Sequence, residues 1–370
     1  MSVQAGDPTS DPGDAPERPH VAVVGAGIVG ARTTRELLTP GADGRPTTAS
    51  VSIVSRRPAR LEQLASTFGR AVSGLSAEHA EADLRPASVV VVAREVGAQL
   101  PVVVEAIAAG RHVVATTDDP DEVEAVLALH PTALAAGVTV VVGVGMSPGL
   151  SCLLVRHAAG LLDVVDEIHV ARDGAAGPAC ARQRLRALRG GATEWRDGAW
   201  VRRAGFSGRE LCWFPDPIGA RDCYRAELAE PAVLVDAFPD VERVSARLAA
   251  SPKDRILAPL PVLVGPPVEG GPGAVRVEVR GRREGRREIV VYGVLDRPGV
   301  AASATAAVVA LWLAGGTAPA GAHGAGAIAD PLPILRELAR RGVRTAVFDG
   351  GSTGASGADA PGILDGTPTA

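Results

Sequence analysis

Lysine is almost absent from this chain of 370 residues: Lys253 is the only one, although lysine and arginine together number 38. With abundant alanine, glycine and proline, this imbalance indicates coding bias rather than a chemical role. The formal net charge is −4, so the chain has no excess of positive charge for a nucleic-acid partner.

Cysteine is also scarce. The four cysteines, Cys152, Cys180, Cys212 and Cys223, show neither paired metal-ligand spacing nor a secretory context. We therefore expect reduced thiols, no metal and a cytoplasmic protein. Residues 1–18 lack the apolar core of a signal peptide and read as a disordered, acidic tail.

Charge is missing from two long stretches, between Glu124 and Arg156 and from Pro298 to Ala329, each long enough to cross a bilayer. Glycine and proline interrupt both of them. In the first, a β-branched run over 139–142 is followed by the turn "GVGMSPGLS", with Ser147 placed to cap a helix that Pro148 opens. This pattern predicts strand, turn and helix, and no membrane span.

A glycine-rich motif follows the N-terminal tail. The apolar strand over 21–24 leads into Gly25, Gly27 and Gly30 at G-x-G-x-x-G spacing, and a helix continues over 32–38. This context predicts a dinucleotide pyrophosphate at the helix N-terminus. The expected cofactor-binding residues here are Gly25, Ala26, Gly27, Ile28, Val29 and Gly30.

Strands and helices alternate over residues 19–160, which predicts an α/β Rossmann domain with a doubly wound parallel sheet. The strand over 138–145 is expected to be its sixth and last. Because ligands bind beyond the carboxyl ends of such strands, Ala93 and Thr116 are further cofactor candidates. The turn supplies the expected substrate-binding residues Gly145, Met146, Ser147, Pro148 and Gly149.

The regular alternation of strands and helices ends after the Rossmann domain. Residues 161–297 are expected to form a mixed α+β substrate and dimerisation domain, with a hairpin over 274–296. Residues 298–349 should supply a C-terminal helix and strand that return to the core, and residues 350–370 a disordered tail. Trp195, Trp200 and Trp213 are expected to fill this domain's core or a dimer face.

The stretches "VAVVGAGIVG", "SRRPARLEQLA" and "HVVATTDDPDEVEAVLALHPTALAAGVTVVVGVGMSPGLSCLLV" resemble the saccharopine dehydrogenase family in its shorter, single-polypeptide form. The resemblance covers residues 19 to about 175, and extends loosely to "DRPGVAASATAAVVALWL". It implies a nicotinamide-dependent oxidoreductase acting on the C–N bond of an amino acid or its imine. It also implies a substrate between two domains and a homodimer formed through the second.

The end of the second strand indicates NADP rather than NAD. An NAD site usually places a carboxylate there to hold the ribose 2′-hydroxyl. Here the strand ends in Ser55, Arg56 and Arg57, which could receive a 2′-phosphate, and the resemblance aligns Arg56 with an arginine of the family.

The catalytic residue is not evident from the sequence. Arg172 and Asp173, at the end of one strand, are candidates, and an arginine there could bind an α-carboxylate. His169 on the same strand reads as structural. Asp118 and Asp119 are placed to face the ligand or, the reading we favour, to cap the next helix.

Two alternatives stay open. Homoserine-type dehydrogenases share this architecture but reduce a carbonyl, and their pattern needs a lysine near an aspartate, which Lys253 and Asp254 alone offer. A nucleotide-binding sensor or scaffold without turnover would explain the lack of a clear proton-transfer residue. The arginines of the hairpin turn are expected to be solvated rather than to bind RNA, because acidic residues alternate with them and no aromatic platform is present.

Overall fold

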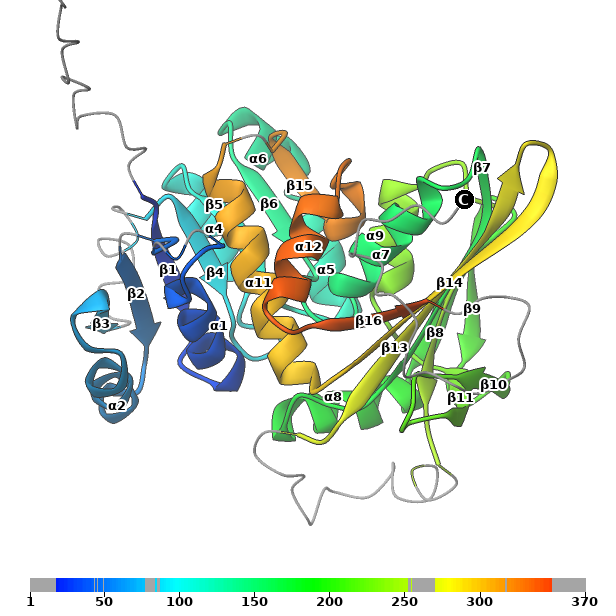
Figure 1. The fold of residues 1–370 in the computed structure, drawn as a ribbon, viewed down its shortest axis with the longest axis horizontal. Coiled ribbons are helices and arrows are strands. Elements are labelled where there is room, and N and C mark those ends of the chain that lie inside the picture. Colours follow the sequence, from blue (N-terminus) through cyan, green and yellow to red (C-terminus); the bar gives the residue numbers. More distant parts are fainter. Residues whose placement is uncertain are drawn as a thin grey trace, which may run out of the picture.

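The computed structural model describes residues 18–42, 44, 46–48, 50–76, 84, 87–251, 254, 270–316 and 318–347. Two β-sheets dominate it, with helices α7 and α9 between them (Figure 1). None of the helices in this part of the chain has both the length and the apolarity to cross a membrane.

The first sheet is parallel at every pairing and has the order β15-β6-β5-β4-β1-β2-β3. Its strands are short and mostly valine-rich, as expected where both faces are buried. They are β1 (His20–Val24), β2 (Ser50–Ser55), β3 (Val72–Ser76), β4 (Val89–Val92), β5 (His112–Ala115), β6 (Thr139–Val142) and β15 (Gly321–Gly324).

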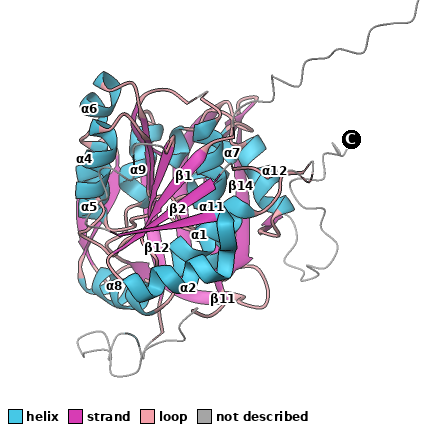
Figure 2. Ribbon diagram, turned by 90° about the vertical axis from the view of Figure 1, so that its left-hand side faces the viewer, coloured by secondary structure: helices cyan, strands magenta, loops and turns pink. Residues whose placement is uncertain are grey.

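Helices cover both faces of this sheet. Figure 2 shows α4, α5 and α6 on one side and α1, α11 and α12 on the other, so the predicted doubly wound architecture is confirmed. The bounds are α1 (Ile28–Leu38), α2 (Pro58–Phe68), η1 (Gly69–Ala71), α4 (Leu100–Ala108), α5 (Pro120–Leu127), α6 (His130–Ala135), α11 (Pro298–Ala314), η3 (Ala325–Ala327) and α12 (Leu332–Arg340).

The C-terminal segment corrects one expectation. The strand over 138–145 is not the last of the parallel sheet, because β15 pairs with β6 on its outer side. The helix α11, formed by the second uncharged run, packs against α1, β4 and β5. The expected C-terminal helix and strand are present: α12 packs against α11, and β16 (Arg344–Val347) pairs with β14 in the second sheet.

The second sheet is mixed, with the order β10-β11-β12-β7-β13-β14-β16 and with β8 and β9 attached beside β12. Only β7 and β12 pair in parallel. The remaining elements are β7 (Val164–Asp173), β8 (Gly191–Arg196), β9 (Ala199–Ala204), β10 (Glu210–Trp213), β11 (Ala220–Arg225), β12 (Arg243–Ala249), β13 (Gly273–Arg283), β14 (Arg286–Asp296), α7 (Leu150–Ala159), α8 (Pro178–Arg189) and α9 (Glu230–Ala237).

The predicted hairpin is confirmed as β13 and β14. Val275, Val277 and Val279 are buried on one face, against which α7 packs. On the other face Glu278 is held between two arginines, Arg276 and Arg280, each with a nitrogen 2.6 Å from a carboxylate oxygen. These ion pairs neutralise the charges on this face of β13, which lies between β7 and β14 in the sheet.

Candidate functional site

The three glycines of the turn after β1 differ in how closely other atoms surround them. A Cβ at Gly25, where φ is 125°, would lie 2.2 Å from the Ala93 carbonyl oxygen. A Cβ at Gly30 would lie 1.8 Å from the Gly25 carbonyl oxygen, but one at Gly27 would meet nothing within 4 Å. The first and third glycines therefore serve close packing, and Gly27 leaves open space.

That open space adjoins the N-terminus of α1. Gly27 is the N-cap, no side chain caps the helix, and its first turn contains no acidic residue. The first N–H groups of a helix lack intrahelical partners and favour an anion. The turn thus has the free N–H groups, the room and the local charge that a pyrophosphate needs.

The end of β2 differs from the sequence expectation in one respect. Arg57 is the N-cap residue of α2, and its backbone N–H donates to the Ser55 hydroxyl over 3.2 Å. Arg56 donates to the Glu95 carboxylate over 2.5 Å. A carboxylate is therefore present at this site after all, because the loop after β4 supplies it.

A buried network fixes the loop after β5. The Gln99 side-chain oxygen accepts from the backbone N–H groups of Thr116 and Thr117, both over 3.1 Å. Glu122 accepts from the Gln99 backbone N–H at 2.8 Å and from the Thr117 hydroxyl at 2.8 Å. Asp119 caps α5 by accepting from the Glu122 N–H, as expected, and Asp118 is left to face the space between the sheets.

A cavity of about 100 Å³ lies between the two sheets. The first half of the chain contributes Val29, Thr116 and Asp118, and the turn after β6 contributes Gly145, Met146 and Ser147. The second sheet, the segment from β7 through α8, and α11 contribute Arg172, Asp173, Gly174, Ala175, Ala176, Cys180, Arg184, Leu248, Val275, Pro298 and Ala302. Residues predicted separately for cofactor, substrate and catalysis thus meet at one place.

The second sheet supplies an ordered wall to this cavity. Arg172 on β7 is in register with Leu248 on β12 and with Val275 on β13, and all three line the cavity. A polar guanidinium therefore stands in a row between two aliphatic side chains. Asp173, the next residue of β7, also lines the cavity, so β7 supplies both a cation and a carboxylate to that wall.

Arg172 is held by groups from three elements. Its guanidinium donates to Asp118 over 3.1 Å and to the Ser147 carbonyl, and its Nε lies 3.9 Å from Glu230 on α9. Burial alone would lower its pKa, but the negative charges of Glu230 and Asp118 raise the pKa above the ordinary arginine value. Arg172 is therefore charged at all physiological pH values.

The turn after β6 corrects the expected helix start. The helix α7 begins at Leu150 with Gly149 as its N-cap, and Ser147 does not cap it. The Ser147 hydroxyl instead donates to Glu230, a fully buried carboxylate, over 2.7 Å. Pro148 and Gly149 are buried and close the turn, since the Gly145 N–H donates to the Pro148 carbonyl at 2.9 Å.

Two further side chains in the cavity were not anticipated as part of a site. Burial and the charge of Asp118 raise the pKa of the Cys180 thiol to about 11, so it is protonated at neutral pH. Arg184 on α8 donates to the Ala249 carbonyl and, over 3.3 Å, to Asp254. Nothing in the spacing of these residues along the chain indicates that they meet.

Other candidates lie elsewhere. His169 is structural, as expected: its ring nitrogens bond Ser245 at 2.7 Å and Glu167 at 2.8 Å, and burial lowers its pKa. Lys253 lies outside the described residues. The arginines of the β13–β14 turn are exposed, as expected.

Of the two places expected for the tryptophans, the core and a dimer face, the structure excludes the core for Trp200 and Trp213, and the dimer face stays a prediction. The Trp195 indole donates to the Val241 carbonyl over 2.8 Å and packs edge-on against Trp200. Trp200 and Trp213 are 49% and 61% exposed, so neither fills the core.

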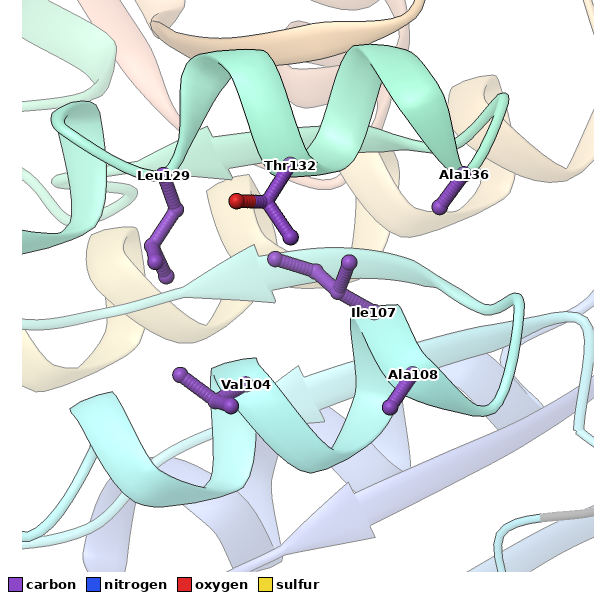
Figure 3. Close-up of a pocket in the computed structure, with 6 residues that line it drawn as sticks. All are labelled: Val104, Ile107, Ala108, Leu129, Thr132 and Ala136. Carbon is purple, nitrogen blue, oxygen red and sulfur yellow. The ribbon is translucent and has the colours of Figure 1, made fainter.

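A larger cavity of about 220 Å³ lies on the outer side of the first sheet, between α4 and α6 (Figure 3). Its lining is aliphatic except for one hydroxyl and consists of Val104, Ile107, Ala108, Leu129, Thr132 and Ala136. It contains no charged or titratable group and lies away from the carboxyl ends of the strands. It therefore lacks the chemistry of an active site.

The architecture matches known structures. Apo saccharopine dehydrogenase (L-Glu forming) from Saccharomyces cerevisiae superposes with a TM-score of 0.64 and 16% sequence identity, over 90% of this chain and 100% of that chain. The chain has the saccharopine dehydrogenase fold. The fold implied by the sequence resemblance is therefore confirmed.

Two further solved structures are more distant. DAP dehydrogenase from C. glutamicum, in complex with DAP, has a TM-score of 0.48 and 17% identity over 88% of this chain and 99% of that chain. GenD2 from gentamicin A biosynthesis, in complex with NAD, has a TM-score of 0.46 and 16% identity over 94% and 100%. No model of a protein family and no curated protein sequence matches this chain.

Proposed function

We propose that this protein is a nicotinamide-dependent oxidoreductase that acts on the C–N bond of an amino-acid-like substrate in the cavity between the two sheets. The observation that carries the proposal is the cavity itself. It joins Val29 at the start of α1, next to the open space at Gly27, to Arg172 of the second sheet, whose side chain is 15% exposed. A ligand on the glycine-rich turn would extend towards charged groups suited to an amino acid.

We assign different parts of the substrate to the charged side chains of the cavity. Arg172 and Arg184 are the guanidinium groups that line the cavity, and we assign the substrate carboxylate to them, with Arg172 the first choice because it lies on the wall formed by the second sheet and beside Asp118. Asp118 and Asp173 are the carboxylates that line the cavity. We assign a substrate ammonium or its proton to Asp118, which is 24% exposed in its side chain and touches Arg172. Cys180, a protonated thiol, contributes no thiolate.

A bound nicotinamide supplies a hydride acceptor or donor at C4. Oxidation of an amine to an imine moves one hydride from carbon to the ring and releases one proton from nitrogen. The side chains of this protein have to orient the substrate, exclude water and take up that proton. The aliphatic groups beside Arg172 and the apolar lining from α11 serve the exclusion of water.

We further propose NADP as the preferred cofactor, on the strength of Arg56 and Arg57 at the end of β2. Arg56 is 62% exposed and so accessible to a 2′-phosphate. One charge-assisted hydrogen bond is worth about 1.5–3 kcal/mol, so Arg56→Ala should weaken NADPH binding about 10- to 150-fold. NADH should lose little, and equal losses for the two nucleotides would contradict the assignment.

The decisive experiment is NADPH oxidation by the purified protein with a panel of 2-keto acids, each with and without an amine. Turnover that requires both components supports the proposal. Turnover with the keto acid alone indicates a carbonyl reductase of the homoserine dehydrogenase type. Nucleotide binding without turnover on any member favours a sensor or scaffold. A second experiment tests the assignment of Arg172 to the substrate carboxylate. Arg172→Met should raise the KM for the substrate and leave NADPH affinity unchanged.

A further inference from the structure

The Arg56–Glu95 ion pair lies across the place where the adenosine half of a dinucleotide would bind. Arg56 follows β2 and Glu95 follows β4, and these strands flank β1, whose carboxyl end leads into the glycine-rich turn. The two side chains meet at 2.5 Å although they are 39 residues apart. The pair thus joins the two loops on either side of the β1 turn.

This pair is not needed to hold the fold together. Both side chains are largely exposed, 62% for Arg56 and 61% for Glu95. Exposed ion pairs contribute little to stability, because water and salt screen them. The contact is therefore easily exchanged for a contact with a ligand.

Glu95 also places a negative charge where a 2′-phosphate would be expected. In the proposed function Arg56 receives that phosphate, which carries a charge of about −1.5 to −2. The phosphate and the Glu95 carboxylate are both partners for one guanidinium, and they repel one another. A 2′-hydroxyl, in contrast, is neutral and leaves the ion pair in place.

We propose that Glu95 is a specificity-determining residue, whose carboxylate competes with the 2′-phosphate for Arg56 and so narrows the preference for NADPH over NADH. This inference rests on the proposed function, since it requires a dinucleotide on the glycine-rich turn. Glu95 thus makes the preference for NADPH over NADH smaller than Arg56 and Arg57 alone would make it. The end of β2 and the loop after β4 then act together as one recognition element.

The test is nucleotide binding rather than activity. NADPH and NADH are titrated by nucleotide fluorescence into the wild type, Glu95→Gln, Arg56→Ala and the double variant. Glu105→Gln, which removes an exposed carboxylate from α4, is the matched control. Glu95→Gln should tighten NADPH about three- to tenfold and leave NADH within about twofold. The gain should shrink as salt is raised.

The double variant decides whether Glu95 acts through Arg56. In the Arg56→Ala background the gain from Glu95→Gln should be mostly lost, giving a measurable coupling between the two sites. An undiminished gain, an equal change for both nucleotides, or the same gain from Glu105→Gln would overturn the inference. A wild type that binds neither nucleotide would instead overturn the proposed function, so the two failures are distinguishable.

Discussion

The glycines of the turn after β1 allow nucleotide affinity and the free energy of unfolding to be changed by different substitutions. Gly27 has φ −73° and ψ −169°, which any residue can adopt, and its added Cβ meets nothing within 4 Å. Gly27→Ala should therefore leave the fold intact, and lower chain entropy in the unfolded state should stabilise it by about 0.4–1 kcal/mol. The new methyl group would stand in the space assigned to the pyrophosphate.

Loss of one charge-assisted hydrogen bond to that pyrophosphate costs about 1.5–3 kcal/mol, which corresponds to about 10- to 150-fold weaker binding. Gly30→Ala should behave in the opposite way, because its Cβ would lie 1.8 Å from the Gly25 carbonyl oxygen. Such overpacking should cost about 1–3 kcal/mol of folding free energy.

The assay combines urea unfolding with NADPH titration. Gly271→Ala, at an equally open position that does not line the cavity, is the matched control: it should show the same small stabilisation of about 0.4–1 kcal/mol and leave NADPH affinity unchanged. If Gly27→Ala binds NADPH like the wild type, no phosphate lies at that turn. If it unfolds more easily, the space is not open as described.

Three further predictions follow from the same contacts. Glu230→Gln keeps an acceptor for Ser147 but loses the charge facing Arg172, so urea unfolding should show a loss of about 1–3 kcal/mol; a change below about 0.5 kcal/mol would contradict the role of this contact. Since the pKa of Cys180 is raised to about 11, its alkylation by iodoacetamide, read by peptide mass mapping, should be very slow at pH 8 and rise with pH towards 11; rapid labelling at pH 7 would show an accessible thiolate. We also predict a homodimer through the second sheet, whose Trp200 and Trp213 are exposed; Trp213→Ser should lower the mass in light scattering, and a monomeric wild type at micromolar concentration would exclude the dimer.

Local sequence pattern was sufficient where one strand or helix decides the outcome. The valines of β1 and β4 predict buried strands, and the alternation of valine with charge predicts β13 and β14. β15 was missed because "GAHG" has no strand propensity of its own. Its extended conformation depends on pairing with β6, about 180 residues earlier in the chain.

The site was predictable only in part, for the same reason. The strand ends that carry Thr116, Arg172 and the turn at Gly145 could be placed from the order of elements. The partners of these groups could not, because Ser147 and Glu230 are 83 residues apart. The incorrect cap at Ser147 arose from local preference, which a buried carboxylate from α9 overrides.

The helix α11 also affects how the chain can be divided. It is buried on almost every side, and the Ser303 hydroxyl donates to the Val29 carbonyl of α1 over 3.2 Å. The half that contains the first sheet thus takes an internal helix and a strand, α11 and β15, from residues synthesised after every strand of the second sheet except β16. A fragment ending near residue 160 would expose the apolar surface of β4 and β5 that α11 covers. The two halves of the protein are therefore interdependent during synthesis, and the first one should need the C-terminal segment before it reaches its native state.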